Sequence, residues 1–289
     1  MAKIHEKNLL VPPNGGIKLS DYNPASTGPY KHKDDAHSKL AKDVEKLSEL
    51  QDVLYASQNC ALLIVLQGMD TSGKDGIIKH VMSGVNPQGV HVKSFKQPSS
   101  EELRHDFLWR AVEPLPGRGY IGIYNRSYYE EVLVTRVHSE ILRNEGVQDA
   151  EDKKLWQQRY DSINNFEKHL TRNGTAVLKF FLNISRDEQK RRLLERIEDE
   201  SKNWKFSAAD LHERAYWTQY QDAFQEMFCK TSTDCAPWHI IPADHKWFSR
   251  VAVADIVIKK LESLGLSYPK LPPQEVENLG KAKAILEKQ

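Results

Sequence analysis

Apolar positions along this chain fall into two patterns, short continuous runs and wider helical spacing. Short segments rich in apolar residues predict five strands, at 61–66, 90–95, 120–124, 175–182 and 238–241. The helical spacing predicts helices at 34–57, 77–83, 99–112, 127–137, 153–172, 186–200, 208–230 and 247–264. The helix at 99–112 is expected to open with a capping box, because Glu102 follows Ser99 by three residues.

Strands that alternate with helices predict a parallel sheet flanked by helices, and hence an α/β fold. A ligand site in such a sheet lies outside the carboxyl ends of its strands. This rule brings together the segments that follow residues 66, 95 and 124. We expect an extended N-terminal arm at 1–33, which is rich in Pro and Gly, a single domain at 34–266 and a tail at 267–289.

Composition narrows the class of protein. The chain has 289 residues and a net charge of +1, so no global basic field predicts binding to nucleic acid. No apolar run approaches the roughly 20 residues that cross a bilayer, and the first residues do not resemble a signal peptide. The three cysteines form no C-x-x-C pair, so neither a zinc site nor a disulfide framework is predicted. A reducing cytoplasm is the expected compartment.

The segment G-M-D-T-S-G-K-D at 68–75 lies between a predicted strand and a predicted helix. In that context it predicts a phosphate-binding loop, whose backbone N–H groups and following helix N-terminus surround an anion. Lys74 is expected to reach the outer phosphates. The other residues expected to bind phosphate here are Gly68, Met69, Thr71, Ser72, Gly73 and Asp75. The alternative is an ordinary strand–turn–helix with a solvated lysine.

Two acidic residues distinguish this loop from the common form. Asp75 occupies the position where Ser or Thr usually supplies a hydroxyl to Mg²⁺. Asp70 lies inside the loop, where its carboxylate would repel bound phosphates. A divalent cation between them removes that repulsion, so Asp70 is predicted to bind metal. The alternative is that Asp70 only caps the turn.

A second candidate element follows the third predicted strand, at 124–130. Asn125 stands where related loops carry a metal-supporting Asp, and its neutral oxygen would bind metal more weakly or through water. Arg126 can clamp phosphate oxygens, and Glu130 lies one helical turn further on. The alternatives are a helix cap for Asn125 and a surface ion pair between Arg126 and Glu130.

Further cations lie near the expected site. Lys93 and Lys96 flank the end of the second strand, and Lys96 falls at its carboxyl end. Arg192 and Arg196 are four residues apart and share one face of the helix at 186–200. That pair suits a lid that closes over phosphates, although a solvated face paired with nearby glutamates explains the spacing equally well.

The sequence resembles the family-2 polyphosphate kinases along nearly its whole length. Beside the loop, the matching segments are S-G-V-N-P-Q-G-V at Ser83, S-F-K-Q-P at Ser94, H-D-F-L-W-R at His105, Y-N-R-S-Y-Y-E at Tyr124, K-N-W-K-F-S at Lys202, Y-W-T-Q-Y at Tyr216 and A-P-W-H-I-I-P-A-D at Ala236. The resemblance implies a P-loop kinase core like that of thymidylate kinase, with a helical lid at about 186–206.

The resemblance also implies roles. Asp70 would anchor Mg²⁺ or Mn²⁺, Lys74 the transferring phosphoryl group and Arg126 the acceptor phosphate, while Arg192 and Arg196 would hold lid-side phosphates. Asn125, where many relatives have Asp, is similar to the class III group that accepts both AMP and ADP. The implied partners are inorganic polyphosphate, adenine or guanine nucleotides and further copies of the chain in a homodimer or homotetramer.

Two other functions compete with a polyphosphate-dependent nucleotide kinase. An ATP-dependent nucleoside monophosphate kinase shares the core and the lid and differs in the phosphoryl donor. A non-enzymatic nucleotide-binding protein would keep the loop without turnover. The family-wide segments favour polyphosphate as donor, and intact Asp70, Lys74 and Arg126 favour an enzyme.

Overall fold

The computed structural model describes residues 4–13, 15–144, 147 and 153–289. The remaining residues, which include 1–3 and 14 of the predicted N-terminal arm, lie outside this description.

Five parallel strands form one sheet in the order β2-β3-β1-β4-β5. They are β1 (Ala61–Gln67), β2 (Val90–Ser94), β3 (Ile121–Asn125), β4 (Thr175–Asn183) and β5 (Trp238–Pro242). All five predicted strands and the parallel sheet are therefore confirmed. Every residue of β1 is buried, as expected for a central strand that is covered on both faces.

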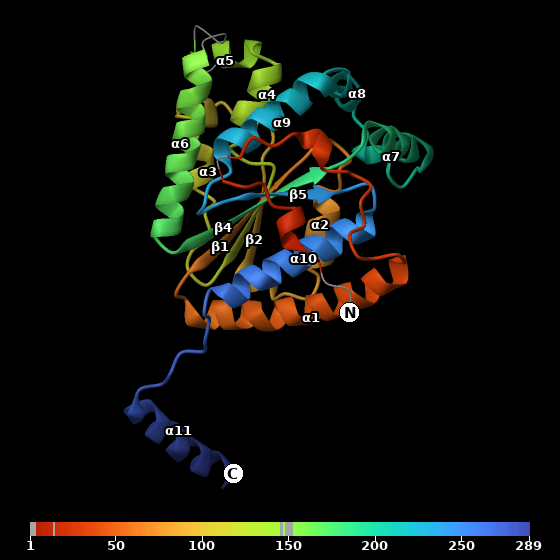
Figure 1. The fold of residues 1–289 in the computed structure, drawn as a ribbon. Helices are drawn as coiled ribbons and strands as arrows, with labels where there is room; N and C mark the ends of the chain where they lie inside the picture. Colours follow the sequence, from red (N-terminus) through yellow and green to blue (C-terminus); the bar gives the residue numbers. More distant parts are fainter. Residues whose placement is uncertain (1–3, 14, 145–146, 148–152) are drawn as a thin grey trace.

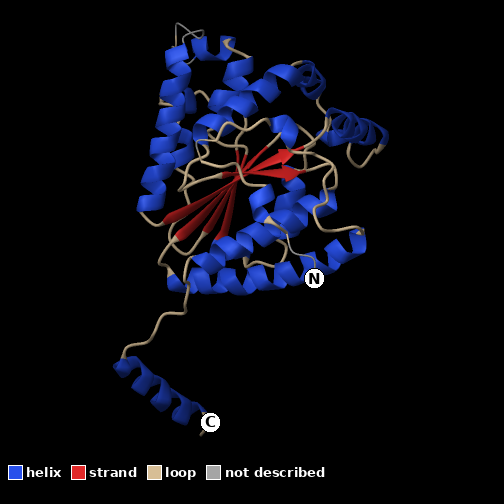
Figure 2. Ribbon diagram, in the orientation of Figure 1, coloured by secondary structure: helices blue, strands red, loops and turns tan. Residues whose placement is uncertain are grey.

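Helices cover both faces of this sheet (Figures 1 and 2). One layer contains α1 (Lys33–Ser57), α2 (Lys74–Val81) and α10 (Lys246–Ser263). The other contains α4 (Glu130–Val137), α6 (Lys153–Arg172) and α9 (Trp217–Thr231). The helices α7 (Arg186–Glu198) and α8 (Ala208–Ala215) lie beyond the carboxyl ends of the strands. The shorter elements are η1 (Glu6–Asn8), η2 (Leu19–Asp21), η3 (Pro87–Gly89), η4 (Glu102–Arg104), α3 (Trp109–Val112), α5 (Glu140–Asn144) and η5 (Asn203–Lys205).

The predicted helix at 99–112 is wrong. The capping box forms, since the Ser99 N–H donates to Glu102 Oε2 at 2.7 Å and the Glu102 N–H donates to Ser99 Oγ at 3.2 Å. It supports only the single turn η4. Asp106 Oδ1 then accepts the N–H of Leu108 at 3.0 Å, and this local bond starts a new turn that leads into α3.

Other helices also begin or end differently from the prediction, among them α2, which begins at Lys74 rather than at residue 77. The segment 208–230 is two helices, α8 and α9, that meet at Tyr216. The helix predicted from residue 127 begins at Glu130, because Arg126 has a left-handed φ of 62° and Ser127 Oγ accepts the N–H of Tyr129 at 3.2 Å. That turn re-aims the chain at the end of β3.

The two ends of the chain behave differently. In the N-terminal segment, the Val11 N–H donates to Trp238 O at 2.8 Å and the Ile240 N–H donates to Leu9 O at 2.7 Å, so this segment covers the outer edge of β5. Near the C-terminus, α11 (Pro273–Leu286) buries no residue and projects away from the sheet (Figure 1). No helix in the described part of the chain is both long and apolar enough to span a membrane.

Candidate active site

The phosphate loop connects the end of β1 to the start of α2. Its chain path needs glycine at Gly68, where φ is 148° and an added Cβ would lie 2.8 Å from Leu182 O. Positive φ recurs at Thr71, at 64°, and at Gly73, at 112°. Alternation of this kind turns successive N–H groups toward one side, which forms an anion-binding concavity.

Donors and acceptors without protein partners gather in this loop. The first hydrogen bond of α2 joins the Ile77 N–H to Gly73 O, so the preceding N–H groups of the helix have no intrahelical acceptor. Thr71 Oγ1 and Ser72 Oγ are buried without a hydrogen-bond partner. A phosphate group placed here would satisfy these atoms, which fits the loop's predicted role.

Lys74 folds back over the loop. Its Nζ donates to Gly68 O at 2.6 Å and to Met69 O at 3.2 Å, and only 8% of the residue is exposed. Burial, aided by the nearby charge of Arg126, lowers the pKa of Lys74 to about 8. A bound phosphate would favour the charged form, so Lys74 is placed to hold one.

Arg126 sits between two carboxylates at the carboxyl ends of β1 and β3. Its guanidinium donates to Asp70 Oδ1 at 2.5 Å and to Glu130 Oε2 at 3.1 Å. The charge of Glu130 contributes most to raising the pKa of Arg126 above its ordinary value. The structure thus brings together Asp70, Arg126 and Glu130, although Asp70 lies 56 positions before Arg126 in the sequence.

Two cavities of about 390 Å³ each meet at Asp70 and Arg126, which line both. The first, the loop cavity, is bounded by the phosphate loop, α7 and the start of α10. Its basic residues are Lys74, Arg126, Arg192, Arg196, Lys202, Lys246 and Arg250. The second, the strand-end cavity, is bounded by the segment after β2 and by α4, α8 and α9. Its apolar residues are Met69, Phe95, Pro98, Leu133, Val134, Ile141, Ala209 and Phe224.

The cations predicted from sequence divide between these cavities. Lys96 lines the strand-end cavity and Arg196 the loop cavity, where it also pairs with Asp210 at 3.3 Å. Lys93 lines neither of the two. The guanidinium of Arg192, although at the wall of the loop cavity, donates to backbone carbonyls such as Thr71 O at 2.9 Å.

Sequence reasoning missed three cations of the loop cavity, namely Lys202, Lys246 and Arg250. Lys246 and Arg250 are four residues apart at the start of α10, so they share a face of that helix. This four-residue spacing was the signal in the sequence that could have identified the pair. Only the packing of α10 beside α2, however, brings that face to the phosphate loop.

The residues present fit a divalent cation that is shared with substrate. Asn125 Nδ2 donates to Asp75 Oδ1 at 2.8 Å, which places the amide and a second carboxylate beside the loop that carries Asp70. Among the described residues, no group of three or more His, Cys, Asp and Glu side chains is arranged to hold a metal alone. Mg²⁺ typically takes one or two carboxylates and completes its shell with water and phosphate oxygens, and Asp70 with Asp75 would supply that share.

Comparisons with known proteins agree with this geometry. The pattern of the family described as Polyphosphate kinase 2 (PPK2) matches residues 30–265. An ADP-polyphosphate phosphotransferase of Rhodopseudomonas palustris is 49% identical over 280 residues, which is 96% of each chain. An AMP/ADP-polyphosphate phosphotransferase of Meiothermus ruber is 42% identical over 91% of this chain and 95% of its own.

Structural comparison leads to the same family. The crystal structure of Polyphosphate Kinase 2 from Arthrobacter aurescens TC1 superposes with a TM-score of 0.89 and 40% sequence identity, covering 100% of this chain and 99% of that one. The P-loop kinase fold predicted from sequence is therefore confirmed. This chain belongs to the polyphosphate kinase 2 family of phosphotransferases.

Proposed function

We propose that this protein transfers the terminal phosphoryl group of inorganic polyphosphate to AMP and to ADP, forming ADP and ATP, with Mg²⁺ or Mn²⁺ as the metal. The transfer is expected to be reversible, and guanine nucleotides are alternative acceptors. The observation that supports this reaction best is the meeting of two cavities at Asp70 and Arg126. One cavity is suited to a polyanion and the other to a nucleotide.

The loop cavity suits polyphosphate because its cations, apart from the shared Arg126, come from four separate segments. Lys74 belongs to the phosphate loop, Arg196 to α7, Lys202 to the segment after α7, and Lys246 and Arg250 to α10. A chain of phosphates carries a charge on every unit, so it gains from cations that extend beyond the loop. The overall net charge of +1 does not oppose such a local track.

The strand-end cavity suits the acceptor nucleotide. Phe95, Leu133 and Phe224 give it an apolar wall that can contact a planar base, while Arg126 and Lys96 supply charge for its phosphates. In this arrangement the acceptor's phosphate oxygen faces the loop across Arg126. We therefore assign Arg126 to the acceptor phosphate and the Lys74 ammonium to the transferred phosphoryl group.

Phosphoryl transfer depends mainly on alignment and on neutralising charge. Lys74 and the N–H groups at the start of α2 bind the phosphates of the donor, and Arg126 holds the attacking oxygen in line with them. Glu130 orients Arg126 through the 3.1 Å ion pair. When bound, the metal would neutralise the phosphate charge that accumulates during transfer. Arg196 and Lys202 would exclude water as the lid closes.

Asn125 supports an acceptor range that includes both nucleotides. The relative from Rhodopseudomonas palustris is named for ADP, and that from Meiothermus ruber for AMP and ADP. An amide at position 125 weakens the second metal contact compared with a carboxylate, which is the feature of the class III group. We propose that both nucleotides are accepted here, by a homodimer or homotetramer in the cytoplasm.

The test is incubation of the purified protein with long-chain polyphosphate, Mg²⁺ and either AMP or ADP, followed by chromatography of the products. Formation of ADP and then ATP from AMP supports the full proposal. Formation of ATP from ADP alone keeps polyphosphate as donor and rejects the class III assignment. Turnover of AMP only when ATP is the donor would identify a nucleoside monophosphate kinase instead. Light scattering on the same sample gives the oligomeric state.

A further inference from the structure

The buried face of α7 contacts carbonyl groups of the phosphate loop. Gln189 Nε2 donates to Asp70 O at 3.1 Å. Arg192 Nη1 donates to Thr71 O at 2.9 Å and to Ser72 O at 3.1 Å. Two side chains, three residues apart on one helix, therefore hold three consecutive carbonyl groups of the loop.

The guanidinium of Arg192 is fully engaged in such bonds. Nη2 donates to Ala243 O at 2.6 Å and to Asp244 O at 3.0 Å, and Nε donates to Glu188 Oε1 at 2.7 Å. A guanidinium has five N–H donors, and the structure uses all five on the protein itself. Only 3% of Arg192 is exposed. It has no N–H left for a phosphate in this arrangement.

The loop conformation explains why such support is needed. Thr71 is β-branched and has a left-handed φ of 64°. A β-branched residue in that region is strained and persists only where its surroundings fix it. Because the carbonyls of Asp70, Thr71 and Ser72 are bound to α7, the neighbouring N–H groups are kept turned toward the phosphate side.

Two further contacts secure this face of α7. Arg214 of α8 donates to Gln189 Oε1 at 2.7 Å and to Arg186 O at 2.7 Å, so α8 is connected to the loop through Gln189. Hydrogen bonds from Arg191 and Arg192 lower the pKa of Glu188 to about 2, so its carboxylate stays charged beside the buried guanidinium.

We propose that Gln189 and Arg192 are positioning residues that hold the phosphate loop in its binding conformation, and that Arg192 is not a phosphate ligand. The inference rests on the proposed function only for the choice of donor. It assigns the first half of α7 to the fixed part of the site. The cations that move with the lid are then those beyond Arg192, namely Arg196 and Lys202.

Replacement of Arg192 by Lys and by Gln separates this role from phosphate binding. Lysine keeps the charge, but its compact ammonium cannot bond five acceptors on three segments. If Arg192 positions the loop, both variants lose kcat by a similar factor, on the order of 100-fold, as expected for displaced reacting groups. The KM for polyphosphate and its dependence on salt stay within about threefold of the unchanged protein, because no phosphate contact is lost.

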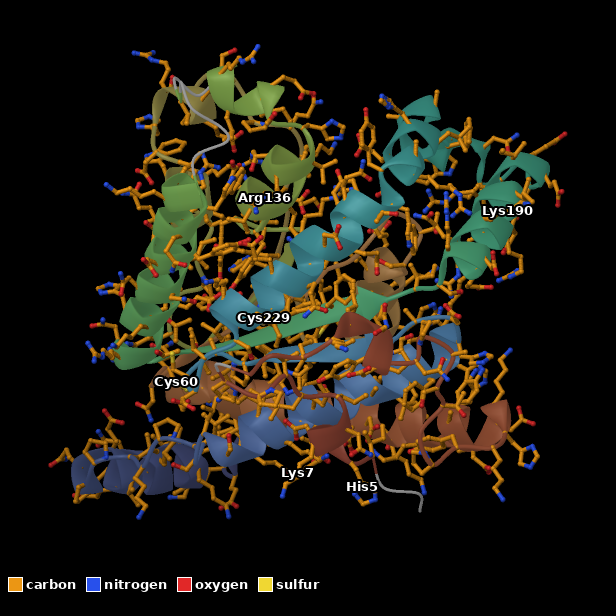
Figure 3. All side chains as sticks on the ribbon, turned by 45° about the horizontal axis from the view of Figure 1, so that its top comes forward. His5, Lys7, Cys60, Arg136, Lys190 and Cys229 are labelled. Carbon is orange, nitrogen blue, oxygen red and sulfur yellow. The ribbon has the colours of Figure 1, made fainter. Side chains whose placement is uncertain are left out.

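Gln189→Met gives a milder test that keeps side-chain volume and removes the bond to Asp70 O, together with the bond that Gln189 accepts from Arg214. It is expected to lower kcat by about fivefold, which corresponds to the loss of one hydrogen bond of roughly 1 kcal/mol that supports the loop. The matched control is Lys190→Gln, one residue along the same helix. Lys190 is exposed and projects at the rim of the molecule (Figure 3), so its replacement should leave kcat and KM unchanged.

Loop positioning and phosphate binding by Arg192 predict opposite results for these variants. The proposal would be overturned if Arg192→Lys kept the activity that Arg192→Gln loses. In that case Arg192→Gln would also show a raised KM for polyphosphate and a weaker salt dependence. If the Arg192 variants do not fold in circular dichroism, Gln189→Met decides, and an unchanged kcat there also overturns it. Unchanged protein is assayed first with polyphosphate and with ATP. Turnover with ATP alone rejects the proposed function, and the same variants are then measured with ATP.

Discussion

Glu167 and Lys179 form an ion pair in which neither side chain is exposed, with Nζ 2.6 Å from Oε2. The hydroxyls of Tyr128 and Tyr129 donate to Glu167 Oε1 at 2.8 and 2.7 Å. Lys179 Nζ also donates to Tyr129 Oη at 2.8 Å and to Thr231 O at 2.7 Å. This network therefore joins α6, β4, α9 and the turn that follows Arg126.

Glu167→Gln keeps the size of the side chain and removes its charge. The change leaves a buried ammonium without its carboxylate, and a broken buried pair destabilises a protein by about 3–5 kcal/mol. Burial lowers the pKa of Lys179, while the charge and the hydrogen bond of Glu167 act to raise it, so Glu167→Gln removes the group that favours the charged form. We expect kcat to fall as well, because the tyrosines that fix the turn beside Arg126 lose their strongest acceptor.

Urea unfolding followed by tryptophan fluorescence measures this loss. The matched control is Glu49→Gln, because Glu49 pairs with Lys46 at 3.4 Å on the surface, where the side chains are 70% and 47% exposed. Such a pair contributes about 0–1 kcal/mol. The double variant Glu167→Gln/Lys179→Met should recover part of the loss, since it removes the uncompensated charge.

A free energy of unfolding for Glu167→Gln within about 1 kcal/mol of the unchanged protein would refute this reasoning. So would a double variant that is less stable than Glu167→Gln by a further 3 kcal/mol or so. Either result would mean that the network fills space without its charges contributing to stability.

Four further predictions concern the site. Lys74→Ala should lower kcat with polyphosphate by about 100- to 1,000-fold while circular dichroism stays unchanged, and a near-normal kcat would contradict the assignment. Because the pKa of Lys74 in the free protein is about 8, its charged, phosphate-binding form is lost as pH rises through that value, so kcat/KM should decline above about pH 8, which a pH series with Lys74→Arg as control checks. Replacing Lys246 and Arg250 together by Gln should raise the KM for polyphosphate and weaken its salt dependence, with the KM for the nucleotide as internal control. Asn125→Asp should change the Mg²⁺ dependence or the ratio of AMP to ADP turnover, and an unchanged profile for both would show that Asn125 is structural.

Local patterns in the sequence were enough to predict the sheet. Four of the five strands are short, mostly apolar runs, while β2 carries His91, Lys93 and Ser94 beside its two valines, and the 20-residue helix α6 was predicted with its observed bounds. The phosphate loop was equally visible, because the glycine and lysine spacing, the preceding strand and the following helix are all consecutive in the chain. Features that depend on neighbours in sequence are available from sequence alone.

Predictions failed at helix ends. The capping box at Ser99 forms, yet the chain leaves the helix at His105, and the bond between Asp106 and Leu108 restarts the turn. The break between α8 and α9 at Tyr216 has no comparable local signal. At 99–112, a competing local hydrogen bond therefore ended a helix that apolar spacing alone predicted to continue.

The amino-acid sequence by itself determined the α/β class, the order of its strands and helices, and the chemistry of the loop that carries Asp70 and Lys74. The tertiary structure alone decided which charges meet. It brought Lys246 and Arg250 of α10 to the loop cavity, and it turned Arg192 toward backbone carbonyls. Spacing along a helix fixes which residues share a face, but the partner of that face is chosen by how helices pack on the sheet, which involves residues far apart in the chain.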